Sequence, residues 1–218
     1  MNTNTLRLRR AAIAVTAATV LPLALTACGT DGKDNASSTS APSTPADDGS
    51  ASQDPGDPMA MDKPFGTACS AVPEDGAGSF DGMAKDPVAT AASNNPVLST
   101  LVAAVKKAGL VDTLNNAQGI TVFAPTNDAF AKIPKADLDK VLGDKATLTK
   151  ILTYHVVGQK ITPAQLENGS FDTLEKGKVT TSGTGENYTV NDTSRVVCGN
   201  VSTANATVYI VDTVLMPK

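Results

Sequence analysis

The segment Thr121–Phe130, T-V-F-A-P-T-N-D-A-F, constrains the fold of this chain more than any other. Its apolar, β-branched beginning predicts a buried strand, which Pro125 ends because proline has no backbone N–H to donate. Thr126 or Asn127 can then cap a helix that starts at once, with Phe130 turned inward. The chain therefore changes from strand to helix within this short segment.

Helix signals dominate the first half of the folded region. Asn95-Pro96 predicts a helix start, because asparagine accepts hydrogen bonds from free amides and proline fits the first helical position. Gly109 predicts the end of that helix. Two more helices are expected, over Pro134–Leu142 and after the cap Asp144, with a further helical turn at Thr162-Pro163. The expected inward-facing residues are Val97, Leu98, Leu101, Val102, Val105, Leu138, Val141, Leu142, Leu148, Ile151 and Leu152.

Strand signals dominate the second half. Short runs of β-branched residues alternate with Gly, Asn and Asp, which is typical of strands separated by turns. Helices followed by strands predict an α+β fold with a mainly antiparallel sheet, and residues 65–218 are long enough for a single domain with its own core. The expected strands are Phe171–Leu174, Lys178–Thr181, Tyr188–Val190, Arg195–Cys198 and Thr207–Leu215.

Residues 1–27 have the pattern of an export signal. Three arginines at positions 7, 9 and 10 precede the apolar run Ala11–Ala24, which is too short to span a bilayer comfortably. The run ends in Leu25-Thr26-Ala27-Cys28, which predicts a lipoprotein signal. Cleavage would leave Cys28 as the lipidated residue, carrying a diacylglyceryl group and fatty acids such as palmitate. An ordinary secretory signal with an incidental cysteine is the alternative.

Residues 28–64 predict a disordered tether. They are rich in Ser, Thr, Pro and Asp and contain too few large apolar residues to bury a core. A flexible coil of this length spans ~30–36 Å on average. We therefore expect the domain at the extracellular face of the plasma membrane, anchored there by lipid, with part of the protein released.

The net charge of the mature chain excludes some classes of binding partner. Loss of three arginines with the signal changes the formal net charge from −4 to −7. An acidic chain binds nucleic acid poorly and has no basic patch for anionic lipid, so we expect no nucleic-acid partner and membrane contact only through the lipid.

Two cysteines remain if Cys28 carries lipid. Cys69 and Cys198 are expected to form a disulfide, because leftover cysteines of exported proteins pair. The loop between them is long, and its closure contributes on the order of 4–5 kcal/mol in the chain-entropy model. A metal site is the rival interpretation, but no cysteine has a second ligand nearby and His155 is the only histidine. We expect no metal and no cofactor.

Catalytic groups are not indicated by the sequence. His155 lies among Ile, Leu and Val, where a hydrogen-bonded structural histidine is expected rather than a base. Asp137 and Asp139 are expected on an exposed helix face, where they serve as solvated charge. Gly183-Thr184-Gly185 lacks the lysine and helix of a phosphate loop and is expected as a turn between strands. We therefore predict that the chain is not an enzyme.

Three blocks, in this order, resemble the fasciclin domain. They are Thr121–Phe130, the stretch I-L-T-Y-H-V-V at Ile151–Val157 and A-T-V-Y-I-V-D-T-V-L-M-P at Ala206–Pro217. The resemblance covers about Ala84–Pro217 and implies a β-wedge with a helical layer. The export signal, the acidic linker and the early and late cysteines are similar to the immunogenic, secreted or lipid-anchored fasciclin-domain proteins of mycobacteria and related actinobacteria.

The resemblance also implies a candidate interaction surface. In animal members of the family, a Tyr-His region and an Asp-Ile pair ahead of the last strands are linked to integrin binding. Tyr154 and His155 match the first region, and Asn200 and Val201 stand at the position of the second. Because Asn200 lacks the carboxylate that could reach an integrin's metal, integrin binding by that route is not implied.

The expected function is therefore interaction without catalysis. We expect a surface-anchored, monomeric adhesion protein that binds a protein or polysaccharide of the cell envelope or extracellular matrix. The alternative is a lipoprotein that holds a lipid or small apolar molecule between its helices and its sheet, which the aliphatic composition with only 4% aromatic residues favours.

Overall fold

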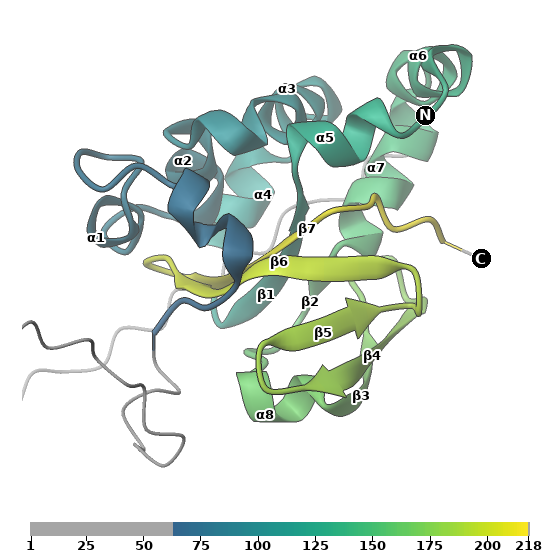
Figure 1. Ribbon diagram of the computed structural model, residues 1–218. Helices are drawn as coiled ribbons and strands as arrows, with labels where there is room; N and C mark the ends of the chain where they lie inside the picture. The colour runs from purple at the N-terminus through teal and green to yellow at the C-terminus, as the bar shows by residue number, and fades with distance from the viewer. Residues whose placement is uncertain (1–62, 218) are drawn as a thin grey trace, which may run out of the picture. The chain divides into compact units, whose positions relative to one another are not determined.

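Helices dominate the first half and strands the second half of the described part of the chain, residues 63–217 of the computed structural model (Figure 1), but two strands lie between the helices. Within these residues no helix is both long enough and apolar enough to cross a membrane. The predicted export signal, Cys28 and almost all of the predicted tether lie outside the described residues. The helices are η2 (Thr67–Ala71), α1 (Phe80–Met83), α2 (Val88–Ser93), η3 (Pro96–Leu98), α3 (Ser99–Ala108), α4 (Val111–Asn116), α5 (Asn127–Ala131), α6 (Lys135–Gly143), α7 (Lys145–Tyr154) and α8 (Pro163–Leu166).

The strands form one mixed sheet in the order β2-β1-β7-β6-β5-β4-β3. Among the described strands only the pair β1/β7 is parallel, and every other pair is antiparallel. The predicted α+β fold with a mainly antiparallel sheet is therefore confirmed. The strands are β1 (Ile120–Pro125), β2 (Val156–Val157), β3 (Asn168–Asp172), β4 (Lys178–Thr184), β5 (Asn187–Val190), β6 (Ser194–Ser202) and β7 (Ala206–Val211).

The parallel strands β1 and β7 separate two hydrophobic cores. Every residue of β1 and β7 is buried, and successive residues point to opposite faces of the sheet. Val122 and Ile210 belong to the core beneath α2, α3 and α7, whereas Phe123 and Tyr209 belong to the core enclosed by β3–β6 and α8. Figure 1 shows the helical layer above β1 and β7, with the β3–β5 hairpins on the side away from it.

The two ends of the sheet meet, so that it nearly closes into a barrel. Val157 of β2 pairs with Thr173, just after β3, in an isolated bridge. Leu174 donates its backbone N–H to the carbonyl oxygen of Val156 at 2.8 Å. Contact between the two outer strands encloses the second core, because it brings the sheet around on itself.

The helix starts predicted from capping residues are confirmed. Thr126 accepts the N–H of Ala129 at 3.1 Å, so of the two candidate caps it is threonine that begins α5. Asp144 accepts the N–H of Ala146 ahead of α7, and Asn95 accepts that of Val97. These side chains satisfy backbone amides that a helix start would otherwise leave free.

Each of the five expected strands differs from the structure at one boundary or at both. β3 begins at Asn168, and β6 continues to Ser202. β7 ends at Val211 rather than Leu215, because Asp212 accepts the N–H of Arg195 through its carboxylate and Thr213–Leu215 then leave the sheet. The predicted Gly183-Thr184-Gly185 turn is shorter than expected, since β4 continues to Thr184. Gly183 has a φ of +143°, and a Cβ there would lie 2.0 Å from the Asn187 carbonyl oxygen, so only glycine fits.

Helices α1, α2 and α4 were not predicted from the sequence. A buried amide positions two of them. Asn205, in the β6–β7 turn, accepts the N–H of Val88 at 2.8 Å through Oδ1 and donates Nδ2 to the carbonyl oxygens of Leu114 and Ala117 at 2.8 and 2.6 Å. One side chain therefore joins the start of α2 and the end of α4 to the sheet.

The predicted disulfide between Cys69 and Cys198 is present in the structure. It joins η2 to the middle of β6. Beside it, Phe65 and Gly199 exchange both backbone hydrogen bonds, and the ring of Phe65 lies edge-on to Tyr188 at 5.6 Å between centroids. The first described residues are thus fastened to the sheet by a covalent bond, a β-bridge and an aromatic contact.

Replacing both cysteines, Cys69→Ser with Cys198→Ser, should lower the free energy of unfolding by about 2–5 kcal/mol, because the unfolded chain regains the freedom of a long loop. Urea unfolding of the oxidised protein, the reduced protein and the double variant measures this. Ser70→Ala, a change at an exposed neighbour in η2, is the matched control. Equal stability of all forms, or two reactive thiols in the native oxidised protein, would contradict the assignment.

Candidate functional site

The structure corrects the expectation that Tyr154, His155, Asn200 and Val201 form an interaction surface. Their exposed fractions are 3, 2, 8 and 1%, so all four side chains lie inside the domain. A partner at the surface reaches only exposed atoms, so these side chains offer it almost no direct contact. The contacts of each residue show what it does there.

Tyr154 fastens the end of α7 to the sheet. Its hydroxyl donates to the carbonyl oxygen of Lys178 at 2.7 Å and accepts from the side-chain amide of Asn191 at 3.0 Å. Asn191 lies in the tight turn between β5 and β6 with a φ of +51°, a conformation that asparagine tolerates better than most residues. The hydroxyl of Tyr154 therefore holds this turn in place through Asn191.

His155 connects α7 to the segment that follows β7. Its Nε2 accepts the N–H of Leu215 at 2.9 Å, which requires the proton on Nδ1, and Nδ1 donates to the carbonyl oxygen of Ile151 at 2.8 Å. Burial lowers the pKa of His155 to about 4, against the opposing effect of the bond to Ile151. The expectation of a hydrogen-bonded, structural histidine agrees with this geometry.

Asn200 and Val201 belong to an irregular stretch of β6. Asn200 has a φ of +57°, at a point where the register between β6 and β7 shifts between Cys198 and Val201. Its side-chain amide donates to the carbonyl oxygen of Lys63 at 3.4 Å, and Val201 packs in the core under the helices. These two residues shape a bulge in the strand.

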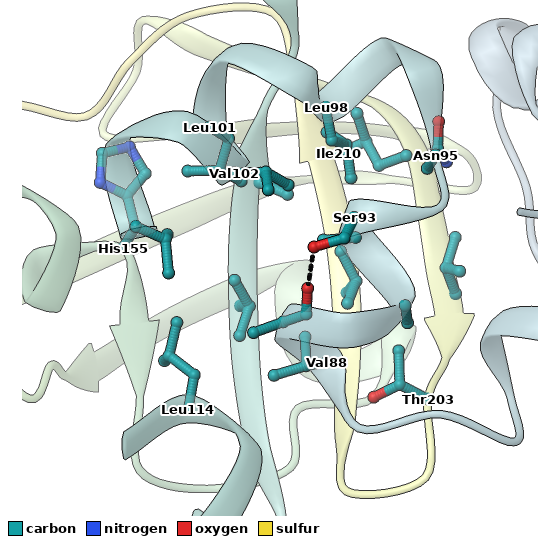
Figure 2. Close-up of a pocket in the computed structure, with 18 of the residues that line it drawn as sticks. Val88, Ser93, Asn95, Leu98, Leu101, Val102, Leu114, His155, Thr203 and Ile210 are labelled. Atoms are coloured by element: carbon teal, nitrogen blue, oxygen red, sulfur yellow. Dashed lines mark hydrogen bonds between the residues drawn. The ribbon is translucent and has the colours of Figure 1, made fainter. Parts of the chain in front are cut away.

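An apolar cavity lies between the helices and the sheet (Figure 2). We call it the helix–sheet cavity. Its volume is about 50 Å³, and the figure shows His155 at one end, with Val88 and Thr203 toward the other. Its walls come from helices α1, α2, η3, α3, α4 and α7 and from strands β1, β2, β6 and β7. The lining residues include Met83, Val88, Leu98, Leu101, Val105, Leu114, Val122, Leu152, Val156, Val201, Val208 and Ile210.

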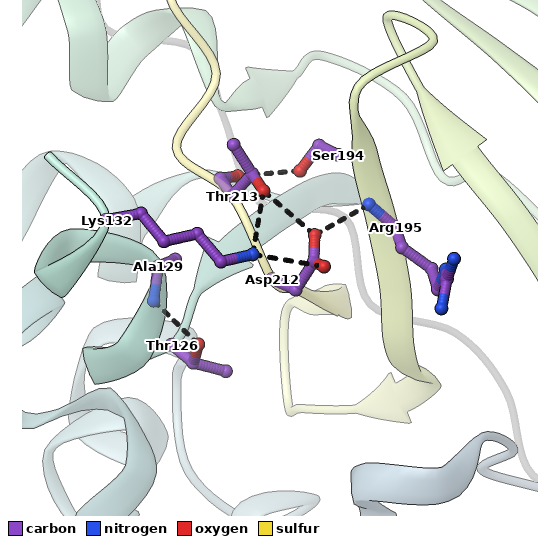
Figure 3. Close-up of polar contacts among 7 residues, drawn as sticks. All are labelled: Thr126, Ala129, Lys132, Ser194, Arg195, Asp212 and Thr213. Carbon is purple, nitrogen blue, oxygen red and sulfur yellow. Dashed lines mark hydrogen bonds and ion pairs between the residues drawn. The ribbon is translucent and has the colours of Figure 1, made fainter.

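A polar cluster stands where α5, β6 and the end of β7 meet (Figure 3). The ammonium group of Lys132 lies 3.2 Å from Asp212 Oδ2 and 3.3 Å from the hydroxyl of Thr213. Burial alone would raise the pKa of Asp212. Hydrogen bonds from the Arg195 N–H, the Thr213 hydroxyl and Lys132, together with the lysine's charge, hold that pKa below its ordinary value.

This cluster holds three elements together. The Asp212 carboxylate pairs with Lys132 and accepts the Thr213 hydroxyl at 3.0 Å and the backbone N–H of Arg195 at 2.9 Å, so its bonds go to other parts of the domain. An open groove of about 520 Å³ runs beside it. Asn127, which lines the groove, accepts the backbone N–H of Thr100 at 2.9 Å and donates to the carbonyl oxygen of Pro96 at 2.9 Å. The groove is lined by Thr100, Asn127, Phe130, Ala131, Lys132, Ile133, Pro134, Lys135 and Leu138.

Within residues 63–217 no group of histidine, cysteine and acidic side chains is arranged to hold a metal ion. Asp137 lies in an exposed ion pair with Lys140 at 3.5 Å, as a solvated charge does. The sequence did not reveal Asn205 or the Lys132–Asp212 pair. The one available signal was Asp212 itself, a charge directly after a run of buried β-branched residues.

The stability of the domain should fall as the pH drops from about 6.5 to 4. In that range the unfolded chain binds a proton at His155 and the folded chain does not, so protonation favours unfolding by up to about 3 kcal/mol. Urea unfolding at pH 7, 5.5 and 4.5 measures the loss of unfolding free energy. The variant His155→Gln is the control, because any pH dependence that it keeps comes from carboxylates. Since the chain has one histidine, NMR titration of its imidazole reads the pKa directly. A value near 6.5 in the folded protein would refute the assignment.

Comparison with known proteins identifies the family. The family model "Fasciclin domain" matches residues 96–217. The cell surface glycolipoprotein MPB83 of Mycobacterium bovis is 50% identical over 147 residues, 65% of this chain and 66% of that protein. The immunogenic protein MPB70 of the same species is 51% identical over 147 residues, 65% of this chain and 75% of that protein. The chain thus matches somewhat less than two thirds of the length of the glycolipoprotein.

A solved structure agrees on the fold. The FAS1 domain pair of the insect cell adhesion molecule Fasciclin I superimposes with a TM-score of 0.51 at 20% sequence identity, over 62% of this chain and 52% of that one. A likeness at this identity concerns the fold, and it matches the helical layer and mixed sheet described above. With the family model and the mycobacterial relatives, it shows that this chain belongs to the fasciclin domain family.

Proposed function

We propose that this chain is a lipid-anchored protein of the cell surface whose fasciclin domain binds a component of the cell envelope or extracellular matrix, without catalysis. The observation that supports this most is the 50% identity to proteins named cell surface glycolipoproteins. The predicted export signal and Cys28, at the position predicted for lipidation, add support from the sequence. Together they favour a role at the surface over a role in solution.

The geometry of the domain supports binding rather than turnover. The only imidazole of the chain is buried and both its nitrogens are engaged within the fold. Four acidic side chains of the described residues, Asp137, Asp172, Glu175 and Asp212, are held in ion pairs with lysines. Reaction chemistry needs a nucleophile, a base and an orienting group within reach of a substrate, and these groups do not meet that requirement.

A second candidate function is the binding of a lipid or small apolar molecule. The observation that favours it is the helix–sheet cavity, whose walls are almost wholly aliphatic. Apolar pockets with few polar groups are the usual form of small-molecule sites, although this one is small. Both functions are compatible with one surface protein, because the cavity lies inside the domain and a macromolecular partner would contact its outside.

Replacing Cys28→Ala should remove the protein from the membrane fraction, because the thiol that receives the lipid is lost. The protein should appear in the medium or as an uncleaved precursor. Detergent phase partitioning and intact-mass measurement distinguish these forms. Cys69→Ser, which removes a different cysteine, should leave membrane association unchanged. Equal partitioning of Cys28→Ala and wild type would reject lipid anchoring.

The mature protein should bind saturably to one class of ligand among cell-envelope polysaccharide, extracellular matrix protein and its own immobilised copies. Surface plasmon resonance against each class measures this, with reduced and denatured protein as the control for unspecific adhesion. Tyr154→Phe is the sharper control. It loses the hydroxyl bonds to Lys178 and Asn191 but stays buried, so the folded variant should bind as wild type does. Absence of binding to all three classes would contradict the proposed function.

A further inference from the structure

The polar groups on the wall of the helix–sheet cavity are all satisfied within the protein. Ser93 donates its hydroxyl to the carbonyl oxygen of Ala89 at 2.8 Å, the contact drawn in Figure 2. Thr203 donates to the carbonyl oxygen of Ala206 at 3.0 Å, and both nitrogens of His155 are engaged. The side chain of Asn95 accepts the N–H of Val97 at 3.1 Å and donates to the sulfur of Met83 at 3.8 Å. No polar atom there needs a ligand, so only an apolar occupant gains free energy by entering.

The cavity exists because the helix above it is built from small side chains. Along α2, Ala89, Ala91 and Ala92 line the cavity where larger residues would fill it. Ala91 is 1% exposed and points into the apolar interior. Facing residues such as Leu101 and Ile210 are large, so the missing volume belongs to the alanine side. Apolar cavities of this kind stay dry and take up apolar molecules.

Helix α2 is held firmly at its first residues. The N–H of Val88 donates to Asn205 Oδ1 at 2.8 Å, and the N–H of Ala89 donates to Asn115 Oδ1 at 3.0 Å. At its other end Ser93 is exposed and lines the cavity, and Val102 on α3 is half-buried there. We call this exposed part of the lining the mouth, and it lies at the end of α2 away from the two amide anchors.

We propose that the helix–sheet cavity binds the end of an unbranched alkyl chain, such as the acyl chain of a fatty acid or lipid. A volume of about 150 Å³ holds a benzene ring, so a cavity of about 50 Å³ excludes rings. A terminal methyl with one or two methylenes fits, and the rest of the chain lies in the mouth beside Ser93 and Val102. The inference rests on the second candidate function and names its ligand class.

The fit predicts how affinity depends on chain length. Each methylene that enters apolar surroundings strengthens binding about fourfold in Kd. The gain continues while added carbons occupy the cavity and its mouth, and it stops when further carbons remain in water. Branched chains should bind more weakly than straight chains with the same number of carbons, because the alanine wall leaves a narrow space.

The test uses the mature full-length protein and dodecanoate labelled with ¹³C at its terminal methyl, below its micelle concentration. We expect intermolecular NOEs from that methyl to Leu101, Val105 and Ile210, and a rise of about 2–4 °C in the unfolding midpoint at saturation. Absence of these NOEs in the wild type, or a midpoint that does not move, would overturn the proposal.

Two alanine variants form a matched pair. Ala91→Leu fills the cavity and should weaken binding at least tenfold, whereas Ala136→Leu adds the same atoms on the exposed face of α6 and should bind as wild type does. Where Ala91→Leu fails to fold, Ser93→Phe blocks the mouth from the surface and replaces it. Equal binding by the filled or blocked variant and the Ala136→Leu control would refute the site.

A second experiment, with phosphatidylcholine vesicles, tests whether the bound alkyl chain comes from a membrane lipid or from a free fatty acid. Vesicle binding that Ala91→Leu abolishes supports a membrane acyl chain as the ligand, and binding of dodecanoate alone supports a free fatty acid. The filled variant should still bind the macromolecular partner of the proposed function. Failure of the macromolecular binding assay can be told apart from failure of the alkyl-binding assay, because the two assays use different ligands.

Discussion

The parallel pairing of β1 with β7 is the constraint on which the rest of the domain depends. Ile120–Pro125 lies beside Ala206–Val211 without a break in register, and all residues of both strands are buried. Strands covered on both faces must supply apolar side chains to two cores at once. Val122 does so toward the helices and Phe123 toward the barrel-like half. The helical layer, the second core and the cavity are all positioned by this pair.

Structure that depends on neighbouring residues could be predicted from the sequence. Structure that depends on contacts between distant parts of the chain could not. Thr126 and Asp144 cap helices through amides two or three residues away, so their signals are local. Helix α2 is short and alanine-rich, and its first amides are held by Asn205 and by Asn115 from other parts of the chain. The end of β7 likewise depends on a contact between Asp212 and Arg195 that no local pattern reveals.

The candidate site shows the same division. Burial of His155 followed from its apolar neighbours, but an interaction surface at Tyr154 and Asn200 came only from resemblance, and the fold places both inside. Their constraint is structural, since one fixes a turn and the other shapes a bulge. The helix–sheet cavity had no sequence signal, because a gap depends on which side chains face each other across α2 and the sheet.

His155 connects the stability of the domain to the character of its interior. The ring lines the helix–sheet cavity and also a smaller apolar cavity of about 20 Å³ beneath α6. An imidazolium there would place a charge between two apolar cavities. Its protonated Nε2 would also face the N–H of Leu215, so that two donors would meet without an acceptor. The neutral ring is therefore required both to hold the segment after β7 and to keep the cavity apolar. Protonation of His155 and binding of an alkyl chain would therefore disfavour each other, because the proton makes the imidazole charged and the alkyl chain requires it to be neutral.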